Sequence, residues 1–190
     1  LMPKHLRAEM ALLGGADLVL ELPVQVSTAS AEGFAAGGVS LLDGLGIVDE
    51  LCFGSECGDT EILMETARIL VAEPPVYRDF LQKNLREGMS FPLARSRALT
   101  SYVTKSAISD VSFGDGHFIF PEQMDSILSS PNNILGIEYC KALLRQNSSI
   151  RPHALLRKGS GYHDSDLSDI SGDFFPSASG IRKLLSTERD

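Results

Sequence analysis

Apolar and polar positions along the first part of the chain predict helices and strands in turn. Residues 6–13 follow a helical period, and residues 17–22 are a short, mostly apolar run that predicts a buried strand. A second helix is expected over 30–45 and a second strand over 49–54. Because helices and strands in alternation imply crossover connections, this order predicts a parallel sheet with helices covering both faces.

The next part of the chain shows only the helical period, in three segments that proline or glycine separates. The predicted helices span 60–72, 75–87 and 91–103. Serine, aspartate and glycine then accumulate, so residues 110–121 are expected to form a flexible connection, followed by a short helix over 123–128. We therefore predict one domain, 1–190, with a helical insertion at about 60–130.

Another helix is predicted to begin at Pro131-Asn132-Asn133 and to end near Gln146, ahead of a further strand over 150–156. Proline blocks helix continuation from its N-terminal side, and either asparagine can cap the new helix. Since a helix needs one cap, the other asparagine could face an anionic ligand at the positive end of the helix. The alternative is one capping asparagine and one turn asparagine.

Two loops follow predicted strands, at the edge where open α/β sheets bind ligands. In the first loop, Gly54 would let a ligand approach the backbone, although an ordinary loop in which Asp59 or Thr60 caps the next helix is the alternative. In the second loop, Arg157 and Lys158 stand beside glycines. A guanidinium can fork onto a phosphate or a carboxylate, so this loop suits anion binding.

The last part of the chain offers a third candidate anion site. Ser177 or Ser179 can cap a helix that carries Arg182 one turn in, so a hydroxyl, free N–H groups and a cation could converge there. A capped helix with a solvent-facing arginine is the alternative. His163 next to Asp164 has the residue types of a catalytic pair, but adjacent side chains seldom face one another, which favours local packing.

Composition narrows the class of protein. The chain has 190 residues, is 43% hydrophobic and carries a formal charge of −8, which argues against a domain that generally coats nucleic acid but leaves a local basic patch for RNA open. It has no long apolar run and no signal-peptide pattern, so we expect no membrane span and a cytoplasmic location. Cys52 and Cys140 are expected to be buried, and Cys57 has no partner at metal-site spacing, so no metal site is predicted.

Six short motifs follow one another along the chain. They are residues 7–12 (RAEMAL), 15–23 (GADLVLELP), 53–56 (FGSE), 131–136 (PNNILG), 162–164 (YHD) and 177–182 (SASGIR). In this order and over most of its length, the chain resembles the tRNA(Met) cytidine acetate ligase family, relatives of the HxGH nucleotidyltransferases. The last motif is similar to the Ser-x-Ser/Thr-x-Ile-Arg signature with which nucleotidyltransferases hold ATP phosphates. The resemblance implies an α/β fold with a Rossmann-like parallel sheet of the nucleotidyltransferase type.

The resemblance also implies a reaction. Acetate would attack the α-phosphate of ATP to give acetyl-adenylate and pyrophosphate, and the acetyl group would pass to N4 of the wobble cytidine of elongator tRNA(Met). It implies that Gly54, Asn132 and Arg157 bind the nucleotide and that Ser177, Ser179 and Arg182 neutralise its phosphates. Mg²⁺ is expected with the triphosphate. The resemblance implies no side chain as the nucleophile, and positioning and charge stabilisation are what an in-line attack requires.

One departure from the family pattern limits these expectations. The family's first strand and HxGH loop precede the arginine that here is Arg7, and this chain has neither. We therefore expect an N-terminally truncated fold, a fragment of a longer protein, and weak ATP binding with little or no adenylation by the chain alone. The alternatives are a nucleotidyltransferase-like enzyme for another substrate and a non-catalytic binding module. An incomplete sheet exposes an edge, so self-association through that edge is also expected.

Overall fold

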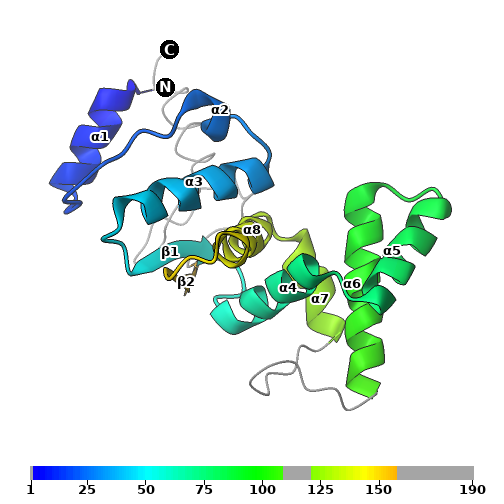
Figure 1. The fold of residues 1–190 in the computed structure, drawn as a ribbon. Coiled ribbons are helices and arrows are strands. Elements are labelled where there is room, and N and C mark those ends of the chain that lie inside the picture. Colours follow the sequence, from blue (N-terminus) through cyan, green and yellow to red (C-terminus); the bar gives the residue numbers. More distant parts are fainter. Residues whose placement is uncertain (1, 109–120, 158–190) are drawn as a thin grey trace, which may run out of the picture.

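A two-stranded parallel sheet and eight helices make up the part of the chain that the structure, a computed structural model, describes: residues 2–108 and 121–157 (Figure 1). The elements are, in order, α1 (Lys4–Leu13), α2 (Val24–Ser27), α3 (Ala31–Leu45), β1 (Glu50–Ser55), α4 (Thr60–Ala72), α5 (Pro75–Arg86), α6 (Phe91–Ile108), α7 (Pro121–Ser129), α8 (Pro131–Gln146) and β2 (Arg151–Leu156). The predicted connection over 110–121 lies, except for its last residue, outside the described residues.

The sheet confirms two predicted strands and their parallel direction. β1 pairs with β2 in a register that runs from Glu50 opposite Arg151 to Ser55 opposite Leu156. Helix α8 crosses one face of this sheet at Gly136, where a Cβ atom would lie 2.6 Å from the ring of Phe53. Only glycine lets the helix approach the strand this closely, so Gly136 sets the distance between α8 and β1.

The other face of the sheet is open within the described residues. The predictions that helices cover both faces and that Cys52 is buried are therefore wrong. Cys52, Gly54 and His153 are exposed on that face, because no described element packs against it. Side chains alternate between the two faces of a strand, so the residues between them, Phe53 and Ala154, point towards the helices. Cys140, by contrast, is buried as predicted.

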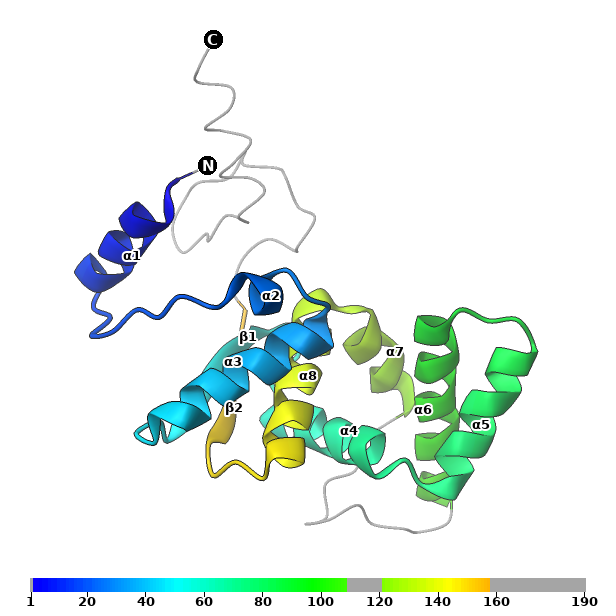
Figure 2. The same ribbon diagram turned by 45° about the horizontal axis from the view of Figure 1, so that its top comes forward.

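The strand predicted over 17–22 does not form. This segment is extended but exposed, and it connects α1 to α2 at a distance from β1 in both views (Figures 1 and 2). A strand needs a neighbour to satisfy its backbone hydrogen bonds, and the described residues place none beside it. One ion pair, from Lys4 Nζ to Glu21 at 2.8 Å, holds it to α1.

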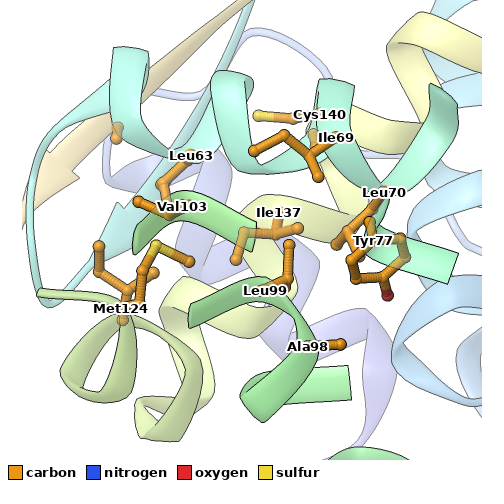
Figure 3. Close-up of a cluster of buried hydrophobic side chains, with 13 residues drawn as sticks. Leu63, Ile69, Leu70, Tyr77, Ala98, Leu99, Val103, Met124, Ile137 and Cys140 are labelled. Carbon is orange, nitrogen blue, oxygen red and sulfur yellow. The ribbon is translucent and has the colours of Figure 1, made fainter. Parts of the chain in front are cut away.

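The main hydrophobic core lies between helices α4 to α8, and the sheet contributes little to it. Buried residues of α4, α6, α7 and α8 meet in one cluster, together with Tyr77 of α5 (Figure 3). Its largest fully buried members are Tyr77, Leu63, Leu99, Met124, Ile137, Val103 and Cys140. The helices predicted from the periodicity of 60–103 are confirmed as α4, α5 and α6, and their apolar faces build this core.

A buried group of charges fixes α8 against its neighbours. The carboxylate of Glu138 is 4% exposed and accepts from Lys141 Nζ at 2.5 Å and from Arg95 of α6 at 3.2 Å. Lys141 also lies 3.5 Å from Glu32 of α3, which in turn pairs with Arg145. Arg95, on α6, is therefore paired with a buried carboxylate of α8.

None of the helices in the described ranges combines the length and the apolar character that a membrane crossing requires.

Candidate functional site at the end of the sheet

Asn133, in the first turn of α8, holds the loop that follows β1. Its side chain is 1% exposed. Its Oδ1 atom accepts three hydrogen bonds, from Ser55 Oγ at 2.7 Å, from the backbone N–H of Glu56 at 2.9 Å and from that of Cys57 at 3.2 Å. A buried amide satisfied by three donors from a distant segment fixes the position of the loop relative to the helix.

Glu56 completes the connection in the opposite direction. Its Oε2 atom accepts from the backbone N–H of Asn133 at 2.9 Å, and its Oε1 atom accepts from the Asn132 side chain at 2.6 Å and from the Asn132 N–H at 3.4 Å. The free N–H groups of the first turn of α8 therefore meet a carboxylate of the protein itself, and the helix dipole favours this negative charge.

This geometry corrects the predicted role of the two asparagines. The helix begins at Pro131, and its N-cap is Ser130, whose side chain makes no capping hydrogen bond. Proline sits at the first helical position because it has no N–H to satisfy there. Neither asparagine caps the helix. Asn133 binds the loop after β1, and Asn132 binds Glu56.

The Glu56 carboxyl group is kept ionised by these contacts. Burial raises its pKa, but hydrogen bonds from the Asn132 side chain and from the backbone N–H groups of Asn133, Glu56 and Asn132 outweigh burial and lower the pKa below its ordinary value. Glu56 is therefore a fixed anion and an acceptor of hydrogen bonds only.

The rest of the loop is closed by local contacts. Ser55 Oγ accepts from the N–H of Gly58 at 3.0 Å, and Gly58 has a φ of 62°, which glycine adopts readily. Asp59 then caps α4 by accepting from the N–H groups of Glu61 at 3.0 Å and Ile62 at 3.1 Å. The predicted capping role of Asp59 is confirmed.

Gly54 and Arg157 come together on the open face at the same end of the sheet. The N–H of Arg157 donates to the carbonyl of Ser55 at 2.9 Å, which extends the strand pairing by one residue. A Cβ atom at Gly54 would lie 3.4 Å from Cγ of Arg157, so the arginine side chain passes over the glycine. An exposed cation thus lies above accessible backbone at the carboxyl ends of both strands.

The structure therefore gathers the first three predicted nucleotide-binding residues around one loop. Gly54 lies near the end of β1, Arg157 bonds to Ser55 at the last position of that strand, and Asn132 bonds to Glu56 in the loop that follows. The other three, Ser177, Ser179 and Arg182, lie outside the described residues, as do Lys158, His163 and Asp164. The described part of the site offers hydrogen bonds and a cation, which suit anion or nucleotide binding.

Sequence reasoning missed the contributions of Glu56, Ser55 and Asn133. The motifs 53–56 and 131–136 drew attention to both segments, but nothing local shows that residues 77 positions apart bond to each other. Among the described residues, no group of three or more His, Cys, Asp or Glu side chains could hold a metal ion.

Comparisons with known proteins show which family the chain is similar to. A family model described as HIGH Nucleotidyl Transferase matches residues 1–190. A tRNA(Met) cytidine acetate ligase of Clostridium perfringens is 43% identical over 185 residues, which are 97% of this chain and 43% of that protein. One from Acetivibrio thermocellus is 46% identical over 184 residues, 97% of this chain and 40% of that protein.

Solved structures give the same result. An apo crystal structure of TmcAL from Thermotoga maritima is 39% identical, with a TM-score of 0.85 over 98% of this chain and 40% of that chain. A second crystal structure of that protein, bound with alpha-thio ATP, has a TM-score of 0.81 and 39% identity over 98% of this chain and 39% of that chain. The predicted α/β fold with a parallel sheet of the nucleotidyltransferase type is confirmed. The chain spans less than half the length of the relatives that it matches.

Proposed function

Because the chain belongs to the HIGH nucleotidyl transferase family, we propose that it is the nucleotide-binding part of an ATP-dependent tRNA(Met) cytidine acetate ligase. In the proposed reaction, a carboxylate oxygen of acetate attacks the α-phosphorus of ATP, and the bond to the bridging oxygen breaks to release pyrophosphate. The N4 amine of the wobble cytidine of elongator tRNA(Met) then attacks the carbonyl of acetyl-adenylate, loses a proton and releases AMP.

The observation that carries the proposal is the meeting of Gly54, Asn132 and Arg157 around one loop at the carboxyl end of parallel strands. Open α/β sheets bind ligands at this edge. Support comes from a 39% identical protein of the same fold whose crystal structure holds alpha-thio ATP. Gly54 would admit the nucleotide to the backbone, Asn132 would hydrogen-bond it, and Arg157 would pair with a phosphate.

The phosphates would also need the C-terminal motif. Ser177 and Ser179 would offer hydroxyl groups, and Arg182 would neutralise charge that develops on the leaving pyrophosphate. Magnesium would be held by the triphosphate, because the described residues provide no ligand set for it.

The same proposal places the protein in the cytoplasm, where free ATP, acetate and tRNA meet. It also takes residues 1–190 as one domain with a helical insertion at about 60–130.

A basic segment favours contact with RNA despite the overall charge of −8. Six of the 17 Lys and Arg residues but only two of the 25 Asp and Glu residues lie between positions 75 and 108, in α5, α6 and their connection. Arg78, Lys83 and Arg86 are exposed on α5, with no ion pair to the described residues. We propose that this segment meets the tRNA backbone, because clustered cations release counterions from phosphates.

Charge reversal tests that contact. Lys83→Glu combined with Arg86→Glu should weaken tRNA(Met) binding by the full-length protein and make it less sensitive to salt. Arg151→Glu, a reversal in β2 on another part of the surface, is the control. The control changes the net charge by half as much, so an effect half as large as that of the double reversal would show that only net charge matters.

The test of the main proposal is calorimetric titration of the 190-residue chain with a non-hydrolysable ATP analogue. We expect saturable binding that Arg157→Ala and Arg182→Ala weaken and that Arg78→Ala, on α5, leaves unchanged. Failure of the folded chain to bind the analogue would favour a non-catalytic module. ATP–pyrophosphate exchange by the full-length protein with acetate, and with other carboxylic acids, would then separate an acetate ligase from an enzyme for another acid.

Self-association through the exposed sheet edge is part of the proposal, since β1 and β2 have no third strand beside them within the described residues. The mass of the chain in solution tests this directly. A value for the monomer at every concentration would contradict it.

A further inference from the structure

The side-chain amide of Asn132 has its orientation set by Glu56. The Asn132 Nδ2 atom lies 2.6 Å from Glu56 Oε1. An ionised carboxylate only accepts hydrogen bonds, so the amide must turn its NH₂ group, and not its oxygen, towards Glu56. Hydrogen bonds hold the pKa of Glu56 low, so the carboxylate keeps this form at neutral pH.

The carboxylate that sets this orientation is itself immobilised. Glu56 accepts from the N–H of Asn133, and its own N–H donates to the buried Asn133 side chain. Backbone N–H groups of a helix cannot turn away, so the carboxylate stays where it is. The Asn132 amide is thus fixed from one side, while its Oδ1 atom accepts no hydrogen bond from the described residues and its side chain is only half-buried.

We propose that Glu56 is a positioning residue that presents Asn132 Oδ1 to the nucleotide as a hydrogen-bond acceptor, so that the site selects a nucleoside with a donor at that position. This inference rests on the proposed function, in which Asn132 meets ATP. Two groups of ATP carry such a donor: the 6-amino group of adenine and the ribose hydroxyls. A 6-oxo purine presents an acceptor in place of the amino group, and two acceptors repel each other.

A single substitution at position 56 should turn the Asn132 amide, so that a donor and not an acceptor faces the nucleotide. In Glu56→Gln, one carboxylate oxygen becomes an NH₂ group, while the N–H of Asn133 still requires an acceptor. The N–H of Asn132 lies farther from the carboxylate, at 3.4 Å against 2.9 Å for that of Asn133, so the remaining oxygen stays with Asn133 and the new NH₂ group faces Asn132. The Asn132 amide then has to turn its oxygen inward and its NH₂ group towards the ligand.

Calorimetry with five triphosphates tests the inference on the 190-residue chain. The ligands are ATP, purine riboside triphosphate (which lacks the amino group), inosine triphosphate, and 2′-deoxy- and 3′-deoxy-ATP. We expect the wild-type chain to bind the analogue that lacks the relevant donor about tenfold more weakly than ATP, the scale of one net hydrogen bond. Weaker binding of the two purine analogues would identify the 6-amino group as the donor to Asn132. Weaker binding of a deoxy analogue would identify the ribose hydroxyl that it lacks.

Glu56→Gln should then remove this tenfold preference, and inosine triphosphate should gain if the amino group is the donor. Glu61→Gln, which removes the same charge from the exposed start of α4, is the control and should leave the preference intact. Asn132→Ala keeps the Glu56 carboxylate and should also abolish the preference. An amide-nitrogen NMR spectrum adds a direct readout, because the Asn132 NH₂ signal should shift in Glu56→Gln.

The possible failures are distinct. Equal weakening of all five ligands by Glu56→Gln, or an unchanged preference, overturns the inference and leaves the proposed function standing. Absence of binding by the folded wild-type chain overturns the proposed function, and the inference falls with it.

Discussion

Two regions of the described chain, the start of α8 with the loop after β1 and the N-terminal segment 4–27, differ in whether their side chains are buried and hydrogen-bonded. Around the start of α8, Asn133, Ser55 and Glu56 are joined by several hydrogen bonds across 77 or 78 positions of sequence. In residues 4–27, α1 and α2 contain no buried residue, and side chains such as Leu13, at 83% exposed, face solvent. Both regions have clear patterns in the sequence, so pattern strength alone does not determine which region is fixed in place.

A strand pattern in the sequence forms a strand only where a second strand and a helix are available to pack against it. The run 17–22 has the composition of a buried strand but has no neighbouring strand among the described residues. The run 50–55 has a neighbour, β2, and a helix over it, and there the predicted strand forms. Backbone groups without a partner gain nothing from leaving water, so the same kind of sequence stays exposed in one place and folds in the other.

The strongest test of the comparison is Asn133→Ala. It leaves the buried Ser55 hydroxyl and the part-buried N–H groups of Glu56 and Cys57 without their acceptor. We expect a loss of about 3 kcal/mol in the free energy of unfolding, because each buried unsatisfied donor costs about 1–3 kcal/mol and the loop can relax. Urea unfolding at neutral pH measures it. A loss below about 0.5 kcal/mol would show that the loop finds other partners.

Lys141→Met should have a smaller effect than Asn133→Ala. It removes one cation from a Glu138 carboxylate that is 4% exposed, leaving Arg95 as its only partner among the described residues. We expect a loss of about 2 kcal/mol, less than the usual cost of breaking a buried pair because Arg95 remains. Arg145→Met is the matched control: its pair with Glu32 is half-exposed, so its loss should stay below about 0.5 kcal/mol. Equal losses would contradict the distinction between the buried and exposed pairs.

Local signals in the sequence were sufficient to predict most of the helices and both strands of the described fold. Helical periods located α3 to α6, and Pro131 marked the start of α8, because each depends on residues a few positions apart. Gly54, Asn132 and Arg157 were selected by the resemblance and by strand ends, and the structure brings them to one loop. The open face that exposes Cys52 and the bonds of Glu56 could not be predicted, because they depend on what else packs nearby.

Low pH should reduce the stability that Glu56 contributes. The folded-state pKa of Glu56 is lowered, so its contribution to stability is complete above the ordinary value of 4.5 and is lost as the pH falls through the lower, folded-state value. Wild type should therefore exceed Glu56→Gln in unfolding free energy at pH 7, and the difference should shrink below pH 4.5. Urea unfolding across this range measures it, with Glu9→Gln in the exposed α1 as the control. A constant difference would contradict the assigned hydrogen bonds.

The smallest effect is expected in the N-terminal segment itself. Leu20 is 40% exposed and Leu63 is fully buried in the main core, so the same substitution to serine separates the two regions. Leu63→Ser should cost at least about 3 kcal/mol, since it leaves a cavity and buries a hydroxyl. Leu20→Ser should cost less than about 0.5 kcal/mol, because Leu20 belongs to neither buried core cluster and its loss leaves no enclosed cavity. A loss above about 1 kcal/mol at Leu20 would mean that the segment has a packing partner in solution, and a loss that grows with protein concentration would identify that partner as a second copy of the chain.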